Sequence, residues 1–376
     1  MSTVKATNFQ NASSSTANMV TDASGNVSFG GTAAMSSSFL RNRIINGDMR
    51  VDQRNAGAAI TPINAQFGVD RWIFSVSQTS KITSQQSSVA PTGFINSTLI
   101  TSSSAYSVLA TDAFWFGQRI EGLNVSDLGW GTASAKTVTL SFQVYSSLTG
   151  TFGGALINSA LNRSYPYTYT ISVANTWTSV SVTIAGDTSG TWLTTNGTGI
   201  QLMFSLGTGT TYSGPAGAWA SALYASATGA TSVVGTSGAT FYVTGVQLEV
   251  GTVATPFERQ IYSNQLAQCQ RYYEEWGGGD AYQAFGIADA ISATVAYSAL
   301  QYLVTKRAAP SGSVSAASNF HTVRGGVAFT DFTFGSLTTT STLATITVAS
   351  GLTAGQAYTY RANGTLNARI KFNAEL

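Results

Sequence analysis

Apolar residues recur at every second position in many short runs of this chain, and no other sequence feature constrains the fold as strongly. A period of two places alternate side chains on opposite faces of a β-strand, so each run predicts a strand with one buried face. Gly- and Thr-rich stretches such as 188–199 and 207–217 predict turns between the strands. The runs are Val138–Val144, Tyr167–Val173, Val180–Ile184, Ile200–Phe204 and Phe241–Val250. Together they predict an all-β fold, with a jelly-roll β-sandwich over 40–260.

One segment departs from this pattern. From Ile261 to Trp276 the apolar and aromatic residues follow a spacing of 4, 3, 4 and 3, which is a heptad seam over about two heptads. The spacing predicts a connecting helix within 261–279, ended by the three glycines at 277–279. The seam either packs on its own sandwich or joins three copies on a trimer axis. Its members are Tyr262, Leu266, Cys269, Tyr273 and Trp276.

The two ends of the chain differ in character. Residues 280–376 return to alternation, for example in Ile291–Tyr297 and in Ile370–Leu376, and predict a smaller C-terminal β domain. Residues 1–39 are rich in Ser, Thr, Ala and Asn, with only Lys5 and Asp22 charged, and cannot bury a core alone. They are interpreted either as a disordered tail or as an arm that anchors the chain on a neighbouring subunit or another protein.

Charged residues make up only 9% of the 376 residues, against about 25% in typical soluble domains. Disorder does not explain this, because aromatic residues reach 11%. No apolar run approaches the roughly 20 residues of a membrane-spanning helix, so no membrane insertion is expected. The basic residues do not form a run, and no charge occurs from Thr188 to Leu248, so nucleic acid is not an expected partner. The predicted surface is instead rich in Ser, Thr, Asn and Gly.

Cysteine usage and the start of the chain point to a reducing site of synthesis. Cys269 is the single cysteine, which excludes an intrachain disulfide. Met1 to Gln10 lacks the apolar core of a signal peptide. The composition nevertheless resembles that of an extracellular protein. A virion protein, made in the host cytoplasm and released by lysis, reconciles these observations and is the expected localisation.

The scarce charges concentrate in one stretch near the start of the sandwich. Arginine and carboxylate side chains of mixed sign favour an ion-pair network that fixes this loop to the sandwich, since guanidinium groups pair with carboxylates through two hydrogen bonds. A pair of catalytic carboxylates is the alternative interpretation. The stretch contains Arg41, Arg43, Asp48, Arg50, Asp52, Arg54, Asp70 and Arg71.

No other constellation indicates an enzyme. His321 is the single histidine, and it would have to meet Cys269 across domains to form a nucleophile pair. The interpretation is a surface histidine and a buried thiol. Glu274 and Glu275 are interpreted as solvated helix charges. There is no P-loop and no dinucleotide-binding glycine motif, and no cofactor or metal site is predicted.

Aromatic residues in Gly- and Thr-rich loops are the candidates for ligand binding. Aromatic rings stack on the C–H faces of sugars, so these residues form a speculative glycan site, although a core or interface role is equally open. The candidates are Trp130, Trp192, Tyr212, Trp219 and Tyr224. Trp72, Trp115 and Trp177 lie in strand-like runs and are predicted to be core.

Several motifs resemble those of a family of bacteriophage tail-fibre and minor virion structural proteins. They are Asn42–Met49 with Asp52-Gln53-Arg54 and Asp70-Arg71-Trp72, Phe114–Gly122, Gly245–Gly251 with Pro256-Phe257-Glu258, Gln270–Tyr273, Lys306–Pro310 and Phe372–Leu376. The resemblance spans about 40–376. It implies a jelly roll like that of carbohydrate-binding modules, a structural or receptor-binding role, and a homotrimer. No catalytic motif can be transferred from it.

These observations lead to three functional hypotheses. The first is a tail fibre that attaches to bacterial surface glycan, with residues 1–39 bound to other virion proteins. The second is a head fibre, capsid decoration protein or tail adaptor without a glycan site. The third is a glycan-degrading spike, which would require two carboxylates in one cleft.

Overall fold

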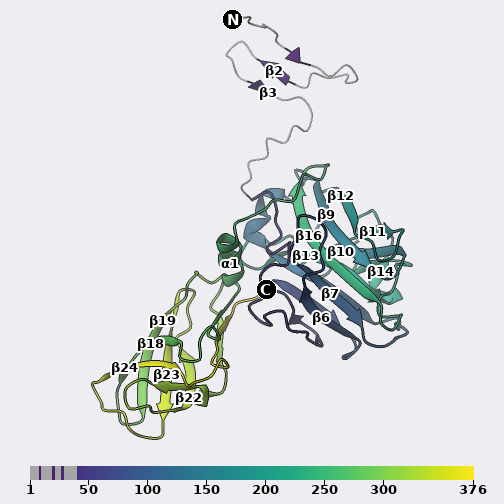
Figure 1. Ribbon diagram of the computed structural model, residues 1–376. Coiled ribbons are helices and arrows are strands. Elements are labelled where there is room, and N and C mark those ends of the chain that lie inside the picture. Colours follow the sequence, from purple (N-terminus) through teal and green to yellow (C-terminus); the bar gives the residue numbers. More distant parts are fainter. Residues whose placement is uncertain (1–7, 10–18, 22–26, 29–39) are drawn as a thin grey trace, which may run out of the picture.

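The computed structural model describes residues 8–9, 19–21, 27–28 and 40–376. Figure 1 shows two β units in succession along the chain, with a short helix beside the junction. The prediction of an all-β chain with a jelly-roll sandwich and a smaller C-terminal β unit is confirmed. Near the start, β1 (Asn8–Phe9), β2 (Met19–Thr21) and β3 (Val27–Ser28) form a small antiparallel sheet. The remainder of the predicted arm lies outside the described residues.

Two antiparallel sheets make up the sandwich. The six-stranded sheet has the order β11 (Ser164–Ile171), β10 (Gly150–Asn158), β13 (Thr198–Thr208), β8 (Ala113–Glu121), β5 (Trp72–Val76) and β4 (Gln66–Phe67). The five-stranded sheet has the order β12 (Thr178–Ile184), β9 (Val138–Ser146), β16 (Thr240–Val250), β7 (Ser97–Ser102) and β6 (Ile82–Ser87). Outside these sheets, β14 (Ser213–Gly214) pairs with β15 (Ser226–Ala227), and η1 (Gly122–Asn124), η2 (Ser126–Leu128) and η3 (Thr210–Tyr212) are single 3₁₀ turns.

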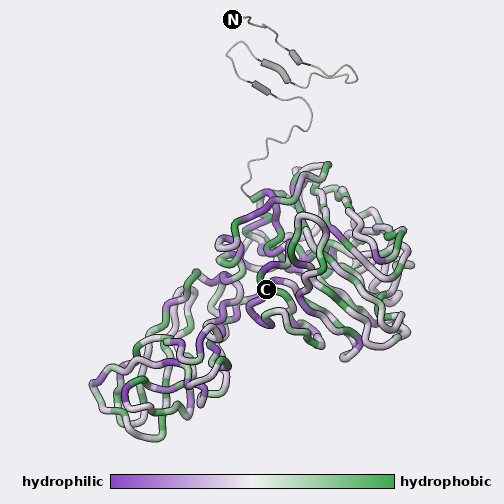
Figure 2. Tube along the Cα trace, in the orientation of Figure 1, coloured by the Kyte–Doolittle hydropathy of each residue, from purple (hydrophilic) through white to green (hydrophobic). Residues whose placement is uncertain are grey.

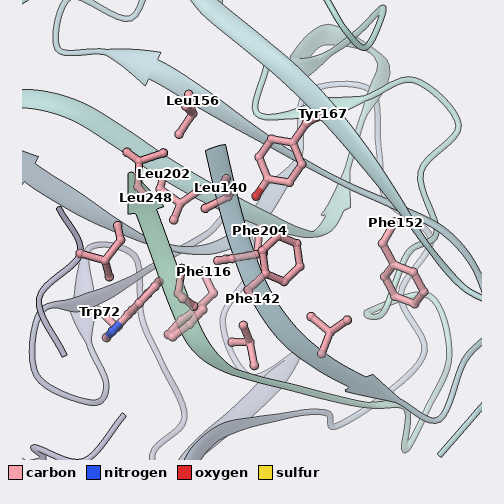
Figure 3. Packing of buried hydrophobic residues seen from close by; sticks show 14 of the residues in the cluster. Trp72, Phe116, Leu140, Phe142, Phe152, Leu156, Tyr167, Leu202, Phe204 and Leu248 are labelled. Carbon is pink, nitrogen blue, oxygen red and sulfur yellow. The ribbon is translucent and has the colours of Figure 1, made fainter. Parts of the chain in front are cut away.

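The sandwich core is aromatic. Trp72 stacks on Phe116 with ring centroids 5.0 Å apart, and Phe142 meets Phe204 edge to face at 5.0 Å across the two sheets (Figure 3). Each such ring removes roughly 150–250 Å² from water, which makes burial the main source of stability here. The prediction that Trp72 is core is confirmed, because its side chain is fully buried. Figure 2 shows hydrophobic and hydrophilic residues mixed along the strands of both units, as half-buried strands require.

The C-terminal unit contains two further sheets with their own buried cluster. One has the order β17 (Tyr273–Trp276), β25 (Ile370–Asn373) and β20 (Ser311–Val314). The other has the order β21 (Phe320–Thr322), β24 (Ala357–Ala362), β18 (Ala284–Ala290), β19 (Val295–Gln301), β23 (Ser341–Val348) and β22 (Phe329–Gly335), preceded by the 3₁₀ turn η4 (Ala317–Asn319). The strand predicted at the chain end is present as β25.

The predicted connecting helix is too long. The helix α1 spans only Tyr262–Gln270, and the chain then turns into β17. In β17, Tyr273 pairs with Asn373 and Trp276 pairs with Ile370 of β25. Strand pairing outweighs the heptad spacing because it joins this segment to a sheet and buries Tyr273. The helix predicted for 261–279 is therefore wrong beyond Gln270, and the glycines at 277–279 follow a strand.

The two-heptad seam does not form for the same reason. Tyr262 is exposed, Leu266 is half-buried and Cys269 is buried on α1, whereas Tyr273 and Trp276 lie on β17. The Trp276 ring packs on Phe372 inside the C-terminal unit, with centroids 5.4 Å apart. These five residues therefore do not share one helix face, and a trimer, if formed, needs another surface.

Candidate functional site

A groove of about 310 Å³ lies on the outer face of the six-stranded sheet. Strand alternation builds its floor: Phe114 and Phe116 enter the core, which turns Trp115 between them outward. In the same way Arg119, Gln201 and Met203 project from β8 and β13 away from the core. The loop after β13 forms one wall with Tyr212, Leu223 and Ala225, and Asn64, Ser75 and Thr111 line the other parts.

Strand pairing places the polar and aromatic side chains of the groove in successive rows. Trp115 of β8 pairs with Ser75 of β5, and two rows along, Arg119 pairs with Gln201 of β13. Gly117 lies between Trp115 and Arg119 on this face and contributes no side chain. A Cβ atom at Gly117 would lie 2.0 Å from the Leu202 carbonyl oxygen, so a larger residue would require the strands to separate. The groove floor thus has an aromatic end and a polar end.

The chemistry of the groove suits the binding of a polyhydroxyl compound. Tyr212 is half-buried and offers part of its ring to a ligand, whereas Trp115 lines the groove as a buried side chain that is 8% exposed. Gln201 and Asn64 supply amide donors and acceptors, and Asn64 Oδ1 accepts a hydrogen bond of 2.9 Å from Ser75. None of the described residues that line this groove is Asp or Glu. Acid–base cleavage of a glycosidic bond, which requires two carboxyl groups, therefore has no support from the lining of this groove.

The polar end of the groove lies beside the C-terminal unit. Arg119 Nη1 donates a hydrogen bond of 2.5 Å to the Leu376 carbonyl oxygen, and burial lowers the pKa of Arg119. Figure 1 shows the end of the described chain beside the sandwich. The last residues of the chain therefore form part of the surroundings of the groove.

The structure separates the five predicted glycan residues. Trp130, Trp192 and Trp219 form one cluster of edge-to-face rings, with centroid distances of 4.8, 5.3 and 5.3 Å. Trp130 and Trp192 are buried, and all three indole N–H groups donate to backbone carbonyls, of Lys136, Ser189 and Ala185. These contacts describe a small packing cluster at one end of the sandwich. Of the five residues, Tyr212 is the one that lines the groove, while the Tyr224 ring covers Gly214.

Sequence reasoning assigned Trp115 and Trp177 to the core. Trp115 is buried as predicted, in a second apolar cluster on the outer face of the sheet. Trp177 is not core, because it is half-buried on the outer face of the other sheet. The signal was present in the sequence, because alternate side chains of a strand point to opposite faces. If Phe114 and Phe116 face the sandwich core, Trp115 between them must face outward.

The ion-pair network predicted near the start of the sandwich is present, with partners from further along the chain. Within the stretch, Arg50 pairs with Asp48 at 2.6 Å, and Arg54 lies 3.8 Å from Asp70. Outside it, Arg43 makes two hydrogen bonds of 2.8 and 2.9 Å to Asp127. Glu375 binds both Arg54, at 2.8 Å, and Arg71. Asp52 is not paired with arginine in this network; it accepts backbone N–H groups of Asn55 and Gly57 and closes its own turn.

The same stretch attaches directly to the last strand of the sandwich. Asn42 accepts the Leu248 N–H at 3.1 Å and donates to the Val246 carbonyl at 3.1 Å. The Val246 N–H in turn donates to the Gly47 carbonyl at 2.9 Å. A Cβ atom at Gly47 would lie 2.2 Å from the Val246 carbonyl oxygen, so glycine is required at this close approach. Asn42 and Gly47 therefore both have a structural role.

Asp70 makes stability depend on pH. Its side chain is 1% exposed, and burial raises its pKa to about 7, because lost solvation outweighs the attraction of Arg54. An unfolded aspartate titrates near pH 3.9, so between these values the folded chain binds more protons than the unfolded chain. The contribution of Asp70 is thus fully present below about pH 4 and is lost as the pH rises through 7. Burial shifts the pKa of Asp52 in the same direction.

We therefore expect Asp70→Asn to reduce the decline in the free energy of unfolding between pH 5 and pH 8, by up to about 3 kcal/mol. Denaturant titrations at the two pH values measure this decline. Asp289→Asn, which changes an exposed carboxylate on β18, is the matched control. An equal decline in Asp70→Asn and in the parent chain would contradict the assignment.

The remaining candidates for chemistry lie apart. Cys269 is a buried free thiol whose pKa is raised well above its ordinary value by burial. His321 lies on β21 in the C-terminal unit and accepts a hydrogen bond of 3.0 Å from Arg361 Nε. The pKa of His321 is lowered mainly by burial and also by the nearby positive charge of Arg361. Among the described residues, no group of three or more His, Cys, Asp or Glu could hold a metal ion.

Glu274 and Glu275 are not solvated helix charges. Both lie on β17, and the Glu274 carboxylate is fully buried against the Lys306 ammonium group. Glu275 accepts a hydrogen bond from Tyr273 and forms ion pairs with Arg369 and Lys371.

In residues 8–9, 19–21, 27–28 and 40–376, no helix has the length and apolar character needed to cross a membrane.

Comparison with known proteins gives structural likenesses alone. No family model matches the chain, and no curated protein matches it. Among solved structures, the enzymatically active domain of tailspike protein 4 of bacteriophage CBA120 is 13% identical over 57% of this chain, with a TM-score of 0.31. The chain spans 22% of that tailspike protein's length.

Two further structures are similar to about half of this chain. A putative sugar binding protein from Bacteroides thetaiotaomicron is 14% identical over 56% of this chain and 100% of its own, with a TM-score of 0.34. The family 11 carbohydrate-binding module from Clostridium thermocellum, in complex with a mixed-linked tetrasaccharide, is 11% identical over 52% of this chain and 97% of its own, with a TM-score of 0.28.

Proposed function

We propose that this chain is a bacteriophage virion protein, a tail fibre, that attaches to host-surface glycan through the groove on the outer face of the six-stranded sheet. The observation that carries the proposal is the composition of the groove: the half-buried ring of Tyr212 and the buried Trp115 lie beside the amides of Gln201 and Asn64. This combination offers an apolar contact for the C–H face of a sugar and hydrogen bonds for its hydroxyl groups.

Three features support the role on a virion. The chain carries few charges, a single cysteine and the motifs that resemble phage tail-fibre proteins. The groove lining supports binding without hydrolysis, so we propose no enzymatic activity. We also propose a homotrimer attached to other virion proteins through residues 1–39. Its interface lies outside the helix seam that the sequence suggested.

A second candidate is a head fibre, decoration protein or tail adaptor without a glycan site. It is favoured by the packing of Trp130, Trp192 and Trp219, which uses their rings and their indole N–H groups within the fold. The two candidates differ in one measurable property, the binding of host polysaccharide.

If the groove binds glycan, Tyr212→Ala and Trp115→Leu should each weaken binding to purified host lipopolysaccharide or capsular polysaccharide about tenfold, as expected for the loss of one ring contact of roughly 1.4 kcal/mol. Tyr212→Ala is the cleaner variant, since Tyr212 is half-buried and Trp115 packs on the sheet. Isothermal titration calorimetry measures the affinity.

Trp219→Phe is the control for this experiment, because it keeps an aromatic ring in the cluster away from the groove. It should leave the affinity unchanged. Binding that is equal in the parent chain and in both groove variants would remove the groove from the proposal. No binding of host polysaccharide by the parent chain would favour the second candidate.

A further inference from the structure

A second groove, of about 400 Å³, lies on the opposite side of the sandwich, on the outer face of the five-stranded sheet. Its floor consists of short polar side chains from β9 and β12. Ser141 pairs with Ser181 and Gln143 pairs with Ser179, which forms two adjacent rows on one face. The Ser179 hydroxyl donates a hydrogen bond of 2.9 Å to the Gln143 amide oxygen. The floor is therefore uncharged and able to form hydrogen bonds.

Aromatic rings stand at one end of these rows. One step further along the same face of β9 lies Tyr145, which pairs with Tyr242 of β16. Trp177 immediately precedes β12 and packs against Tyr145. The three rings are in contact, with centroids 5.0 Å apart for Tyr145 and Tyr242 and 5.6 Å for Tyr145 and Trp177. All three are half-buried, although they lie on the side of the sheet that faces away from the core. A row of half-buried aromatic side chains outside the core is available to a ligand.

A second aromatic group forms the wall of the groove. Phe94 and Phe257 meet edge to face at 5.2 Å, and the Arg259 guanidinium lies over both rings, 4.7 Å and 5.8 Å from their centroids. Gly245 allows the Phe94 ring to lie close to the sheet. It lies in a β-bulge with φ of 62°, and a Cβ atom at this position would lie 2.7 Å from the Phe94 ring. The wall is thus fixed by the backbone of β16.

Arg259 gives the groove its charge. It is exposed, it is the one charged residue among those described that line the groove, and no carboxylate in the described chain forms an ion pair with it. Stacking on Phe94 and Phe257 orients the guanidinium group and leaves its N–H groups for an external anion. A neutral hydrogen-bonding floor, aromatic rings and one oriented guanidinium match a sugar chain that carries an acidic group.

We propose that this second groove is a separate binding site for an acidic oligosaccharide, with the hydroxyl groups on the serine and glutamine floor and a carboxylate bound by Arg259. The site shares no lining residue with the first groove, so it does not rest on the proposed function of that groove. Two sites on opposite faces of one sandwich would let a single chain bridge or doubly engage a polysaccharide.

Affinity electrophoresis of the full chain in gels containing polygalacturonate, alginate or neutral hydroxyethyl cellulose tests this site. We expect the two uronate polymers to retard the parent chain more than the neutral polymer does. Arg259→Gln should weaken uronate binding about tenfold, since a charge-assisted hydrogen bond contributes roughly that factor. Phe257→Ala should also weaken it, because it removes one of the two rings that orient the Arg259 guanidinium.

Arg324→Gln is the charge-matched control, because Arg324 is an exposed arginine in the C-terminal unit. It should behave like the parent chain. Equal losses in Arg259→Gln and Arg324→Gln would show only a general attraction of polyanions and would overturn the proposal. So would absence of retardation by either uronate polymer. Ser179→Ala removes one hydroxyl group from the floor of the groove and should also weaken uronate binding.

Light scattering measures the number of associated chains in each variant. If these variants change that number, the groove is a contact between copies of the chain and the proposal is overturned.

Discussion

Glu375→Ala is expected to lower the free energy of unfolding by about 3–5 kcal/mol, the usual cost of leaving one partner of a buried ion pair without the other. Arg71 is 1% exposed, and Glu375 is the carboxylate that binds it. The Arg71 guanidinium also stacks on Tyr272, 3.5 Å from the ring centroid, and donates to the Arg119 carbonyl at 2.6 Å. Neither contact neutralises its charge. Without Glu375 a buried cation would remain without a counter-ion.

The position of Glu375 gives this loss a second consequence. Glu375 follows the last strand of the C-terminal unit, whereas Arg54 and Arg71 belong to the sandwich. The alanine variant should therefore also weaken the connection between the two units. Denaturant unfolding followed by intrinsic fluorescence should show two separated transitions in place of one, because each unit has its own buried cluster.

Two variants sharpen this experiment. Glu375→Gln keeps an acceptor for Arg54 and Arg71 without the charge and should fall between the parent chain and Glu375→Ala. Asp289→Ala removes an exposed carboxylate from β18 and should change the free energy of unfolding by less than about 0.5 kcal/mol. If Glu375→Ala matched Asp289→Ala, the ion pair would not connect the units energetically.

The contrast between local and distant partners explains which parts of this fold could be predicted. Alternation within Val138–Val144 and Val180–Ile184 depends only on neighbouring residues, and both runs form strands of one sheet. The heptad spacing after Ile261 is equally local, yet it is wrong beyond Gln270, since Tyr273 and Trp276 pair with a strand almost a hundred residues later. Local spacing cannot show that a distant strand offers a better set of hydrogen bonds.

The same reasoning applies to the charges and the candidate site. Clustering of arginine and carboxylate residues predicted a network correctly, but Arg71 and its partner Glu375 are 304 positions apart. In the groove, Tyr212 was selected because it lies in a loop. Trp115 was correctly predicted to be buried, but its position in the lining of the groove was not predicted. Only the parity of the strand, which depends on how Phe114 and Phe116 are buried, reveals that Trp115 faces outward.

A second buried pair gives the other large expected effect. Lys306 and Glu274 are both fully buried, and their charged groups are in direct contact in the C-terminal unit. Lys306 Nζ also donates to the Gln270 carbonyl at 2.5 Å, and Glu274 accepts the Leu303 N–H at 3.1 Å. The pair therefore joins the end of α1, strand β17 and the segment before β20.

Lys306→Met is expected to cost about 3–5 kcal/mol, because it leaves the Glu274 carboxylate buried without a cation. The double variant Lys306→Met, Glu274→Gln removes both charges and keeps similar volumes, so it should recover a large part of this loss. Thermal and denaturant unfolding of the two single variants and the double variant give the coupling energy between the residues. A double variant as unstable as the sum of the single variants would mean that the charges do not interact. A positive coupling of several kcal/mol would show that the buried charges of Lys306 and Glu274 stabilise each other.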